Sequence, residues 1–154
     1  MLTWHVKSFK ELSQEELYEA LKIRAEIFVV EQNCPYNDLD NKDNIAKHVL
    51  GKEGEKIVAY SRIFKEGDFY TDHASIGRIL ISGEKRKKKI GNELVEKSIN
   101  YCKENFPGAE IKISAQFHLK GFYQKAGFVY KGEAYLEDGI PHCSMYHRRL
   151  AEFF

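Results

Sequence analysis

The segment from residue 74 to residue 115 constrains the fold of this chain most, because it alternates strand, helix and strand. Residues 74–81 and 109–115 are short apolar runs, and between them apolar residues recur along one helix face until Pro107. Gly77, inside the first run, predicts a bulge or a close backbone approach. Two strands joined by one helix form a parallel pair with a right-handed crossover. The segment therefore predicts that part of the sheet is parallel.

Shorter strand-like runs lie on both sides of this segment and predict antiparallel neighbours. Residues 52–55 contain a glycine between two such runs, which is typical of a hairpin turn. Residues 135–139 are expected to connect the last two runs. The predicted strands outside the central segment are residues 2–9, 48–51, 56–64, 128–132 and 140–148. Parallel and antiparallel neighbours together predict an α+β fold with a mixed sheet.

The first predicted helix has a clear start signal. Ser13 and Glu16 fit a capping box, in which the Ser13 hydroxyl accepts from the Glu16 amide and the Glu16 carboxylate accepts from the Ser13 amide. Apolar residues recur at three- and four-residue spacing across residues 17–28, as expected for a helix that packs on a sheet. Pro35 and the Asn- and Asp-rich residues 37–41 then predict a loop.

The composition places the chain among ordinary globular proteins. It has 154 residues, of which 43% are hydrophobic and 31% charged, and we expect one domain over residues 1–154. No apolar run approaches the ~20 residues of a membrane span, and we recognise no secretory signal, so we expect a cytoplasmic protein without a membrane partner. The net charge of +1 argues against a nucleic-acid partner, which usually requires a basic excess.

The three cysteines do not indicate a disulfide framework. Cys34, Cys102 and Cys143 are widely spaced and form no C-x-x-C pair. Cys102 falls on the apolar face of a predicted helix, where it belongs to the core. Cys34 and Cys143 lie near histidines, which leaves zinc as an alternative, but we expect no metal.

The basic run from Lys85 to Lys89 carries the strongest chemical signal. It stands between a predicted strand and the start of an amphipathic helix, where unpaired backbone amides and the helix dipole favour an anion. Gly91 lets a ligand approach the backbone closely. The alternative is a solvated lysine-rich turn. Neither the Walker pattern nor the dinucleotide-binding fingerprint is present, so the expected anion is not bound by one of those loops.

The order of strand, basic loop, helix and strand, followed by the run from Phe122 to Phe128, resembles the GNAT superfamily of N-acetyltransferases. The acetyl-coenzyme A loop of that family reads R/Q-x-x-G-x-G/A. Arg86 and Gly91 keep its first and last positions, whereas Lys89 replaces the middle glycine. Further motifs are similar to the ElaA-like branch: residues 28–36 with Asp40, Asp43 and His48, then 77–79, 115–119 and 137–142.

The resemblance implies a mixed, mostly antiparallel sheet with a central splayed parallel strand pair, flanked by helices. It implies acetyl-CoA as cosubstrate, with the pantetheine arm between strands 74–81 and 109–115. The reaction moves an acetyl group to a primary amine of a small molecule or peptide, and a homodimer is common among relatives. The alternative is a non-catalytic sensor that binds CoA or acyl-CoA. The residues expected to bind the cofactor are Ile79, Leu80, Ile81, Arg86, Lys87, Lys88, Lys89, Ile90, Gly91 and Asn92.

The resemblance also implies which residues catalyse the transfer. Tyr123, on a predicted helix over residues 119–126 that Gly127 closes as a left-handed cap, is expected to protonate the leaving thiolate; the alternative is a core aromatic. His118 and His142 are expected bases, with a helix-start and a backbone-bonded histidine as their structural alternatives. Glu31, Glu137 and a water chain are further candidates for taking the proton.

The acceptor is expected to meet the end of the first long helix, the loop after it and the neighbouring strands. Arg62 and Arg78 lie within predicted strands, where an arginine is often paired and structural. If either faces the pocket, it suggests an acceptor that bears a carboxylate or phosphate. The residues expected to bind the acceptor are Phe28, Glu31, Gln32, Tyr36, His48 and Arg62.

Overall fold

The structure is a computed structural model that describes residues 2–83 and 88–147. The described residues form two compact units. One comprises Met1–Ile63 with Arg78–Val95, and the other comprises Phe64–Gly77 with Glu96–Phe154. Helix α2 (Lys88–Asn105) contributes residues to both units.

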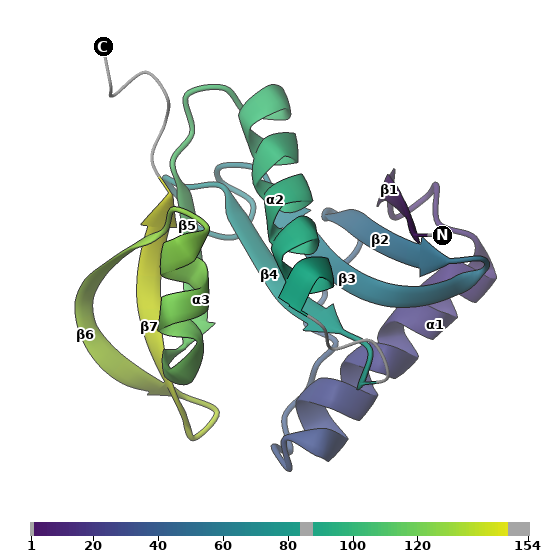
Figure 1. Cartoon of the computed structure of the whole chain (residues 1–154), viewed down its shortest axis with the longest axis horizontal. Helices are drawn as coiled ribbons and strands as arrows, with labels where there is room; N and C mark the ends of the chain where they lie inside the picture. The colour runs from purple at the N-terminus through teal and green to yellow at the C-terminus, as the bar shows by residue number, and fades with distance from the viewer. Residues whose placement is uncertain (1, 84–87, 148–154) are drawn as a thin grey trace. The chain divides into compact units, whose positions relative to one another are not determined.

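A four-stranded sheet forms the centre of the first unit, with its strands in the order β1-β2-β3-β4 (Figure 1). The pairs β1–β2 and β2–β3 are antiparallel, which confirms the predicted hairpin. The strands are β1 (Leu2–Ser8), β2 (Lys47–Glu53), β3 (Lys56–Phe64) and β4 (Ser75–Ile81).

Helix α1 (Gln14–Arg24) covers one face of this sheet (Figure 1). The predicted capping box is confirmed, because Glu16 N donates to Ser13 Oγ over 3.0 Å and Ser13 N donates to Glu16 Oε1 over 2.8 Å. The core between helix and sheet consists of buried apolar side chains with Tyr60 among them. They are Leu12, Ala20, Leu50, Ile57, Tyr60 and Leu80, with Leu17, Ile23, Ile27 and Phe28 packed against them.

The predicted α-helix over residues 17–28 changes character after Arg24. The next segment, η1 (Ala25–Glu31), is π-helical. At its end, Gln32 N donates to the Ile27 carbonyl and Cys34 N to the Val29 carbonyl, each five residues back. The apolar spacing predicted a helix correctly, but it could not distinguish four-residue from five-residue hydrogen bonding.

The second unit contains a three-stranded antiparallel sheet in the order β5-β7-β6. Its strands are β5 (Ile111–Gln116), β6 (Val129–Glu137) and β7 (Ile140–His147). After β5 follow a 3₁₀ turn, η3 (Phe117–Leu119), and helix α3 (Lys120–Lys125), which packs beside this sheet (Figure 1). Gly127 has φ +104°, which confirms the predicted left-handed cap.

The prediction that residues 135–139 connect the last two strands is wrong. Strand β6 runs to Glu137, and the turn consists of Asp138 and Gly139, whose φ angles are +51° and +78°. Two consecutive positive φ angles match the twist of paired strands, so an Asp-Gly pair makes a two-residue hairpin turn. Strand β6 continues beyond its apolar start, because it pairs with β7 again after a register shift between Lys131 and Tyr135.

The expected splayed parallel pair is not seen among the described residues. Strands β4 and β5 belong to different sheets, and parallel pairing is limited to one bridge between Ala74 and Ile111. Ala74 N donates to the Glu110 carbonyl over 3.0 Å, and Lys112 N donates to the Ala74 carbonyl over 2.8 Å. The backbone irregularity predicted at Gly77 occurs one residue later, where Arg78 has φ +49°.

Candidate functional site

The start of α2 is the described part of the predicted phosphate loop. Helix α2 begins at Lys88 and has no acidic residue in its first turn. Lys89 and Asn92 are exposed, and Ile90 and Gly91 are half-buried. Arg86, Lys87 and the side chain of Lys88 lie outside the described residues. A cation at the start of a helix is repelled by the helix dipole, so a lysine in this turn favours an anionic neighbour.

The strand that leads to this helix holds the three other residues predicted to contact the cofactor. Leu80 belongs to the core, whereas Ile79 and Ile81 are only half-buried. Beyond them, Ser82 N donates to the Val58 carbonyl over 2.8 Å. The backbone groups of this strand are the ones predicted to pair with a ligand, and that role stays a prediction.

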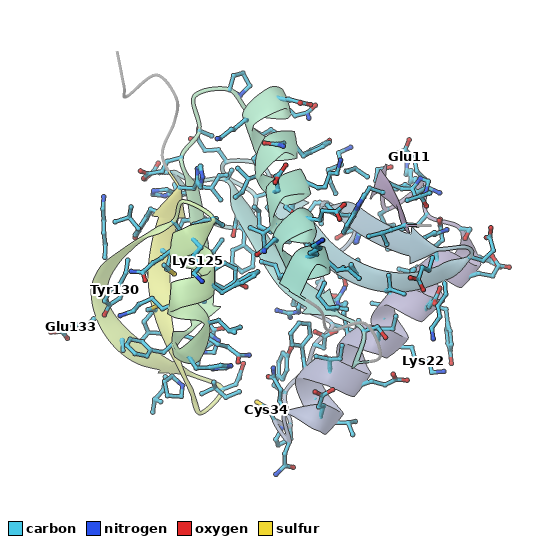
Figure 2. All side chains as sticks on the ribbon, in the orientation of Figure 1. Glu11, Lys22, Cys34, Lys125, Tyr130 and Glu133 are labelled. Carbon is cyan, nitrogen blue, oxygen red and sulfur yellow. The ribbon has the colours of Figure 1, made fainter. Side chains whose placement is uncertain are left out.

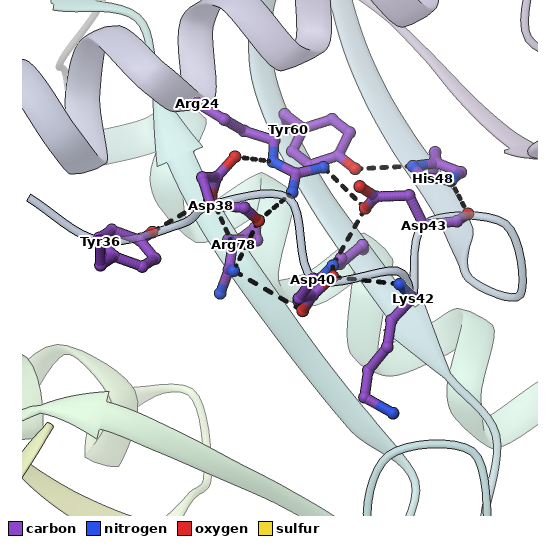
Figure 3. A network of polar contacts seen from close by, with 10 residues as sticks. Arg24, Tyr36, Asp38, Asp40, Lys42, Asp43, His48, Tyr60 and Arg78 are labelled. Atoms are coloured by element: carbon purple, nitrogen blue, oxygen red, sulfur yellow. Dashed lines mark hydrogen bonds and ion pairs between the residues drawn. The ribbon is translucent and has the colours of Figure 1, made fainter. Parts of the chain in front are cut away.

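A network of arginines and aspartates fixes the loop between η1 and β2 (Figure 3). Arg24 on α1 binds Asp38 and Asp43, with Nε 2.9 Å from Asp38 Oδ2 and Nη1 2.7 Å from Asp43 Oδ1. Arg62 on β3 binds Asp43 at 3.0 Å and also binds Asp40 through two nitrogens. Arg24 and Arg62 therefore share Asp43, and each binds a further aspartate of the loop.

The third arginine of the network comes from the distorted part of β4. Arg78 Nε donates to Asp38 Oδ1 over 2.7 Å, and Arg78 Nη2 donates to the Asp38 carbonyl over 3.0 Å. The Tyr36 hydroxyl donates to the same Asp38 Oδ1 over 3.1 Å, and the Arg78 guanidinium lies 5.5 Å from the Tyr36 ring centroid. One aspartate thus holds α1, β4 and the loop together.

Two buried rings complete the network at its inner end (Figure 3). His48 Nε2 lies 2.9 Å from the Asp43 carbonyl, and His48 Nδ1 lies 2.6 Å from the Tyr60 hydroxyl. A carbonyl only accepts, so Nε2 carries the proton and donates it, and Nδ1 accepts from Tyr60. Burial lowers the pKa of His48 and raises the pKa of Tyr60, so both are neutral and suit this arrangement.

The network also shifts the pKa values of its carboxylates. Burial alone would raise the pKa of Asp40, but hydrogen bonds and charge from Arg62 outweigh it and lower the pKa to about 2. Asp43 is half-buried, and Arg24 and Arg62 outweigh the effect of burial and hold its pKa below the usual range. Both aspartates are therefore ionised at neutral pH, and their charges are matched by neighbouring guanidinium groups.

The residues predicted to bind the acceptor fall into two groups. Tyr36, His48 and Arg62 come together in the network; His48 and Arg62 are 1% exposed and bind groups of the chain itself. In this structure they position the loop, and a direct contact with an acceptor stays a prediction. The others lie on or just after η1, where Phe28 packs on the core, Glu31 is exposed and Gln32 is half-buried.

The residues predicted to catalyse the reaction lie in the second unit. Tyr123 on α3 is 6% exposed, and its ring meets Phe122 and Phe128 edge to face. Burial raises the pKa of its hydroxyl, so it is protonated at neutral pH and is able to act as an acid. His118, on η3, is exposed.

His142 on β7 is the other predicted base, and it is 7% exposed. Its Nδ1 lies 2.7 Å from the Ile140 carbonyl, and its Nε2 lies 3.5 Å from Glu137 Oε2. Ser114 Oγ donates to Glu137 Oε1 over 3.0 Å and lies 2.6 Å from the Tyr135 hydroxyl. Sequence reasoning missed Ser114 and Tyr135, because nothing local links a residue on β5 to one on β6.

The described residues show neither a metal centre nor a membrane span. Within them, no three histidine, cysteine or acidic side chains are placed to hold a metal ion together. None of the helices among them is long and apolar enough to cross a membrane.

Known proteins resemble this chain over nearly its whole length. It is 41% identical over 147 residues to protein ElaA of Escherichia coli (strain K12), which covers 94% of this chain and 95% of that protein. The crystal structure of Escherichia coli ElaA matches with a TM-score of 0.90 and 39% identity, covering 96% of this chain and 100% of that one.

A second crystal structure is similar over nearly the whole chain. It is that of an acyl-CoA N-acyltransferase from Pseudomonas aeruginosa, which matches with a TM-score of 0.90 and 34% identity over 96% of this chain and 99% of that one. Residues 9–148 match the family described as acetyltransferase (GNAT) domain. Because these matches span most of the chain, it belongs to the GNAT acetyltransferase family.

Proposed function

We propose that the chain is an acetyl-CoA-dependent N-acetyltransferase that acetylates a primary amine of a small molecule or peptide. The observation that carries the proposal is the start of α2, where Lys89 is exposed in a first turn without acidic residues, directly after β4 and the basic loop. This arrangement suits a pyrophosphate. The fold of the family and the acyl-CoA N-acyltransferase relative support the same cosubstrate.

The residues proposed to hold the cofactor are those of the strand and of the helix start. Backbone groups of Ile79, Leu80 and Ile81 pair with the pantetheine arm, and the amides at Ile90 and Gly91 face the phosphates. Lys89, in place of the usual loop glycine, adds a positive charge. Acetyl-CoA supplies an activated thioester carbonyl, and Tyr123 donates a proton to the sulfur that leaves. A histidine or carboxylate removes the proton of the amine.

The first test is a thermal melt with acetyl-CoA, ATP or NAD at equal concentration. A ligand at ~100 times its dissociation constant stabilises a protein by about 2.7 kcal/mol. For a domain of this size the midpoint should rise by about 5–10 °C. A rise specific to acetyl-CoA supports the cofactor assignment. The absence of a rise contradicts it.

A charge reversal locates the binding site. Lys89→Glu should weaken acetyl-CoA binding at least about tenfold, because it places a negative charge beside the pyrophosphate. A glutamate near the start of a helix interacts favourably with the helix dipole, so the variant should fold as stably as the wild-type protein. A weaker affinity would therefore not be due to unfolding. Lys97→Glu is the matched control, since Lys97 is exposed further along α2. Equal affinity for both variants would remove the start of α2 from the site.

Turnover separates the enzyme from the alternative sensor. The wild-type protein should release free thiol from acetyl-CoA when a panel of primary amines is added. Binding of acetyl-CoA without amine-dependent thiol release would favour a non-catalytic CoA-binding module.

A further inference from the structure

One face of the sheet β5-β7-β6 gathers polar side chains from all three strands. Ser114 pairs with Ser144, and Tyr135 pairs with His142, so these side chains stand on the same face. The alternate positions of β5 and β7 point to the opposite face, where they are buried. Residues on that buried face include Ile111, Ile113, Ala115, Cys143 and Met145. The polar face is half-exposed and is able to meet a ligand.

Glu137 is held on this face by a chain of hydroxyl groups. The Ser114 hydroxyl donates to Glu137 Oε1 over 3.0 Å. Because that donation uses the single proton of Ser114, the Tyr135 hydroxyl donates to Ser114 Oγ over 2.6 Å. The carboxylate is therefore fixed through one oxygen, and its other oxygen, Oε2, is directed at His142.

His142 and Glu137 present two acceptors to each other when the imidazole is neutral. His142 Nδ1 lies 2.7 Å from the Ile140 carbonyl, so it carries the ring proton and donates it. The lone pair of Nε2 then faces Glu137 Oε2 at 3.5 Å. Two acceptors at this distance repel each other unless a donor lies between them. That donor is either an N–H group on Nε2 itself or an N–H group of a ligand. The side chain of His142 is 9% exposed and that of Glu137 is 49% exposed, so the carboxylate is the more accessible of the two groups.

Aromatic rings on the same face hold lysine side chains of the chain itself. Lys112 Nζ lies 4.5 Å from the Tyr70 ring centroid and 5.8 Å from the Tyr146 ring centroid, and Lys131 Nζ lies 5.3 Å from the Tyr146 ring centroid. Burial and the nearby negative charge of Glu137 raise the pKa of Tyr70 to about 12. Tyr70 thus faces the same group of side chains as Glu137.

We propose that Glu137 is the carboxylate that binds the acceptor as a primary ammonium ion and takes its proton, with His142 as its positioning residue. This rests on the proposed acetyltransferase function. The proton moves from the ammonium nitrogen to Glu137 Oε2, and the neutral amine forms a C–N bond to the thioester carbonyl carbon of acetyl-CoA. The C–S bond breaks, the sulfur takes a proton from Tyr123, and the new amide nitrogen releases its second proton to water. Tyr123 and Glu137 then exchange protons with solvent.

In this proposal Glu137 takes the proton of the amine, and His142, which the sequence predicted as a base, positions Glu137. Both ring nitrogens of His142 face groups of the chain, Nδ1 the Ile140 carbonyl and Nε2 the Glu137 carboxylate. The ring orients Oε2 and shares the proton that Glu137 receives.

Binding of n-butylammonium chloride tests the proposal without a known acceptor. The protein is labelled with ¹⁵N in its histidine rings, and the His142 signals are assigned with His142→Gln. Titration should shift the His142 ring nitrogens saturably. N,N,N-trimethylbutylammonium, which has the charge but no N–H group, should bind about tenfold more weakly. Sodium chloride at equal ionic strength is the control for screening.

Two isosteric variants locate the effect on one side chain. Glu137→Gln should change the His142 ring shifts of the free protein and abolish the response to butylammonium. Glu133→Gln is the matched control, because Glu133 is exposed on the same strand and points away from the sheet (Figure 2). It should titrate like the wild-type protein. A wild-type protein without a saturable shift, or a Glu137→Gln variant that titrates like it, overturns the proposal.

The same variants separate this proposal from the function on which it rests. Stabilisation by acetyl-CoA should be equal in Glu137→Gln and the wild-type protein. If acetyl-CoA stabilises neither protein, the acetyltransferase function fails, whereas the butylammonium titration still decides whether Glu137 binds an ammonium ion. With an amine that the wild-type protein acetylates, Glu137→Gln should lower kcat/KM at least about a hundredfold, and His142→Gln should have a smaller effect.

Discussion

Burial affects the protonation of single side chains in this protein as much as neighbouring charges do. Tyr123 shows this, because its side chain is buried and its ring packs edge to face against Phe122 and Phe128. Burial raises the pKa of the hydroxyl, so Tyr123 keeps its proton at neutral pH and has it available for a leaving group.

At the residue scale we therefore expect Tyr123→Phe to lower amine-dependent thiol release at least about tenfold. The substitution removes only the hydroxyl and keeps the ring in its contacts, so the affinity for acetyl-CoA should not change. Steady-state thiol release and calorimetric titration measure the two quantities. Tyr130→Phe is the control, since Tyr130 lies on β6 outside the predicted catalytic set. Unchanged turnover in Tyr123→Phe would make this tyrosine a core aromatic.

At the scale of elements, the end of α3 depends on one glycine. Gly127 has φ +104°, and a Cβ built on it would lie 2.8 Å from His147 Nε2. A side chain there would be strained by its own backbone and would also displace a ring that packs on Phe128. Gly121, within α3, has ordinary backbone angles and open space around it. Gly121 inside α3 and Gly127 just after it thus have opposite constraints.

Gly127→Ala should destabilise the protein by about 1–2 kcal/mol, the cost of a left-handed backbone for a residue with a Cβ, and more if His147 does not move. Gly121→Ala should be neutral or stabilise it by up to about 1 kcal/mol, because alanine has the higher helix propensity. Urea denaturation of both variants measures the free energies of unfolding. A Gly127→Ala variant as stable as Gly121→Ala would contradict the constraint.

Elements were predictable from the sequence where their signals are local. The capping box of Ser13 and Glu16 and the cap at Gly127 depend on residues a few positions apart, and both are confirmed. The extension of β6 to Glu137 depends on pairing with β7, and the apolar run at its start gave no sign of it. The π-helical turns of η1 are likewise invisible to apolar spacing.

Sites were less predictable than elements, because their partners are distant in the sequence. Arg62 was predicted as an acceptor contact, but its position beside Asp40 and Asp43 depends on how the loop folds over β3. Ser114 and Tyr135 gave no sequence signal, since their meeting depends on the strand order β5-β7-β6. Charged residues in a loop predict that they have ion-pair partners, but the sequence does not show which residues those partners are.

For the molecule as a whole, several buried titratable groups make stability depend on acidity in the same direction. Burial lowers the pKa of His48 below its ordinary 6.5, so the unfolded chain takes up this proton first as pH falls. Glu16 is also buried, but hydrogen bonds from Lys52, the Ser13 amide and Lys7 outweigh that effect and lower its pKa from 4.5 to about 2. Asp40 has its pKa lowered from 3.8 to about 2.

These shifts predict two stages of acid destabilisation. The contribution of His48 is fully present above pH 6.5, the ordinary pKa, and is lost as pH falls from there toward the lower folded-state pKa. The carboxylates contribute fully above their ordinary pKa values, and their contribution is lost as pH falls from 4.5 toward about 2. The urea midpoint should therefore decline gently below pH 6.5 and steeply below pH 4.5.

Two variants test which titratable group causes each stage of acid destabilisation. His48→Gln keeps a donor and an acceptor but does not titrate, so its urea midpoint should stay level between pH 7 and 5, where that of the wild-type protein declines. Glu16→Gln should retain the upper decline and lose part of the lower one, because the amide has no proton to gain. Each variant is the control for the other. If His48→Gln declines as steeply as the wild-type protein in the upper range, the upper stage belongs to another group, and the tautomer assigned from the Asp43 carbonyl and the Tyr60 hydroxyl loses its support.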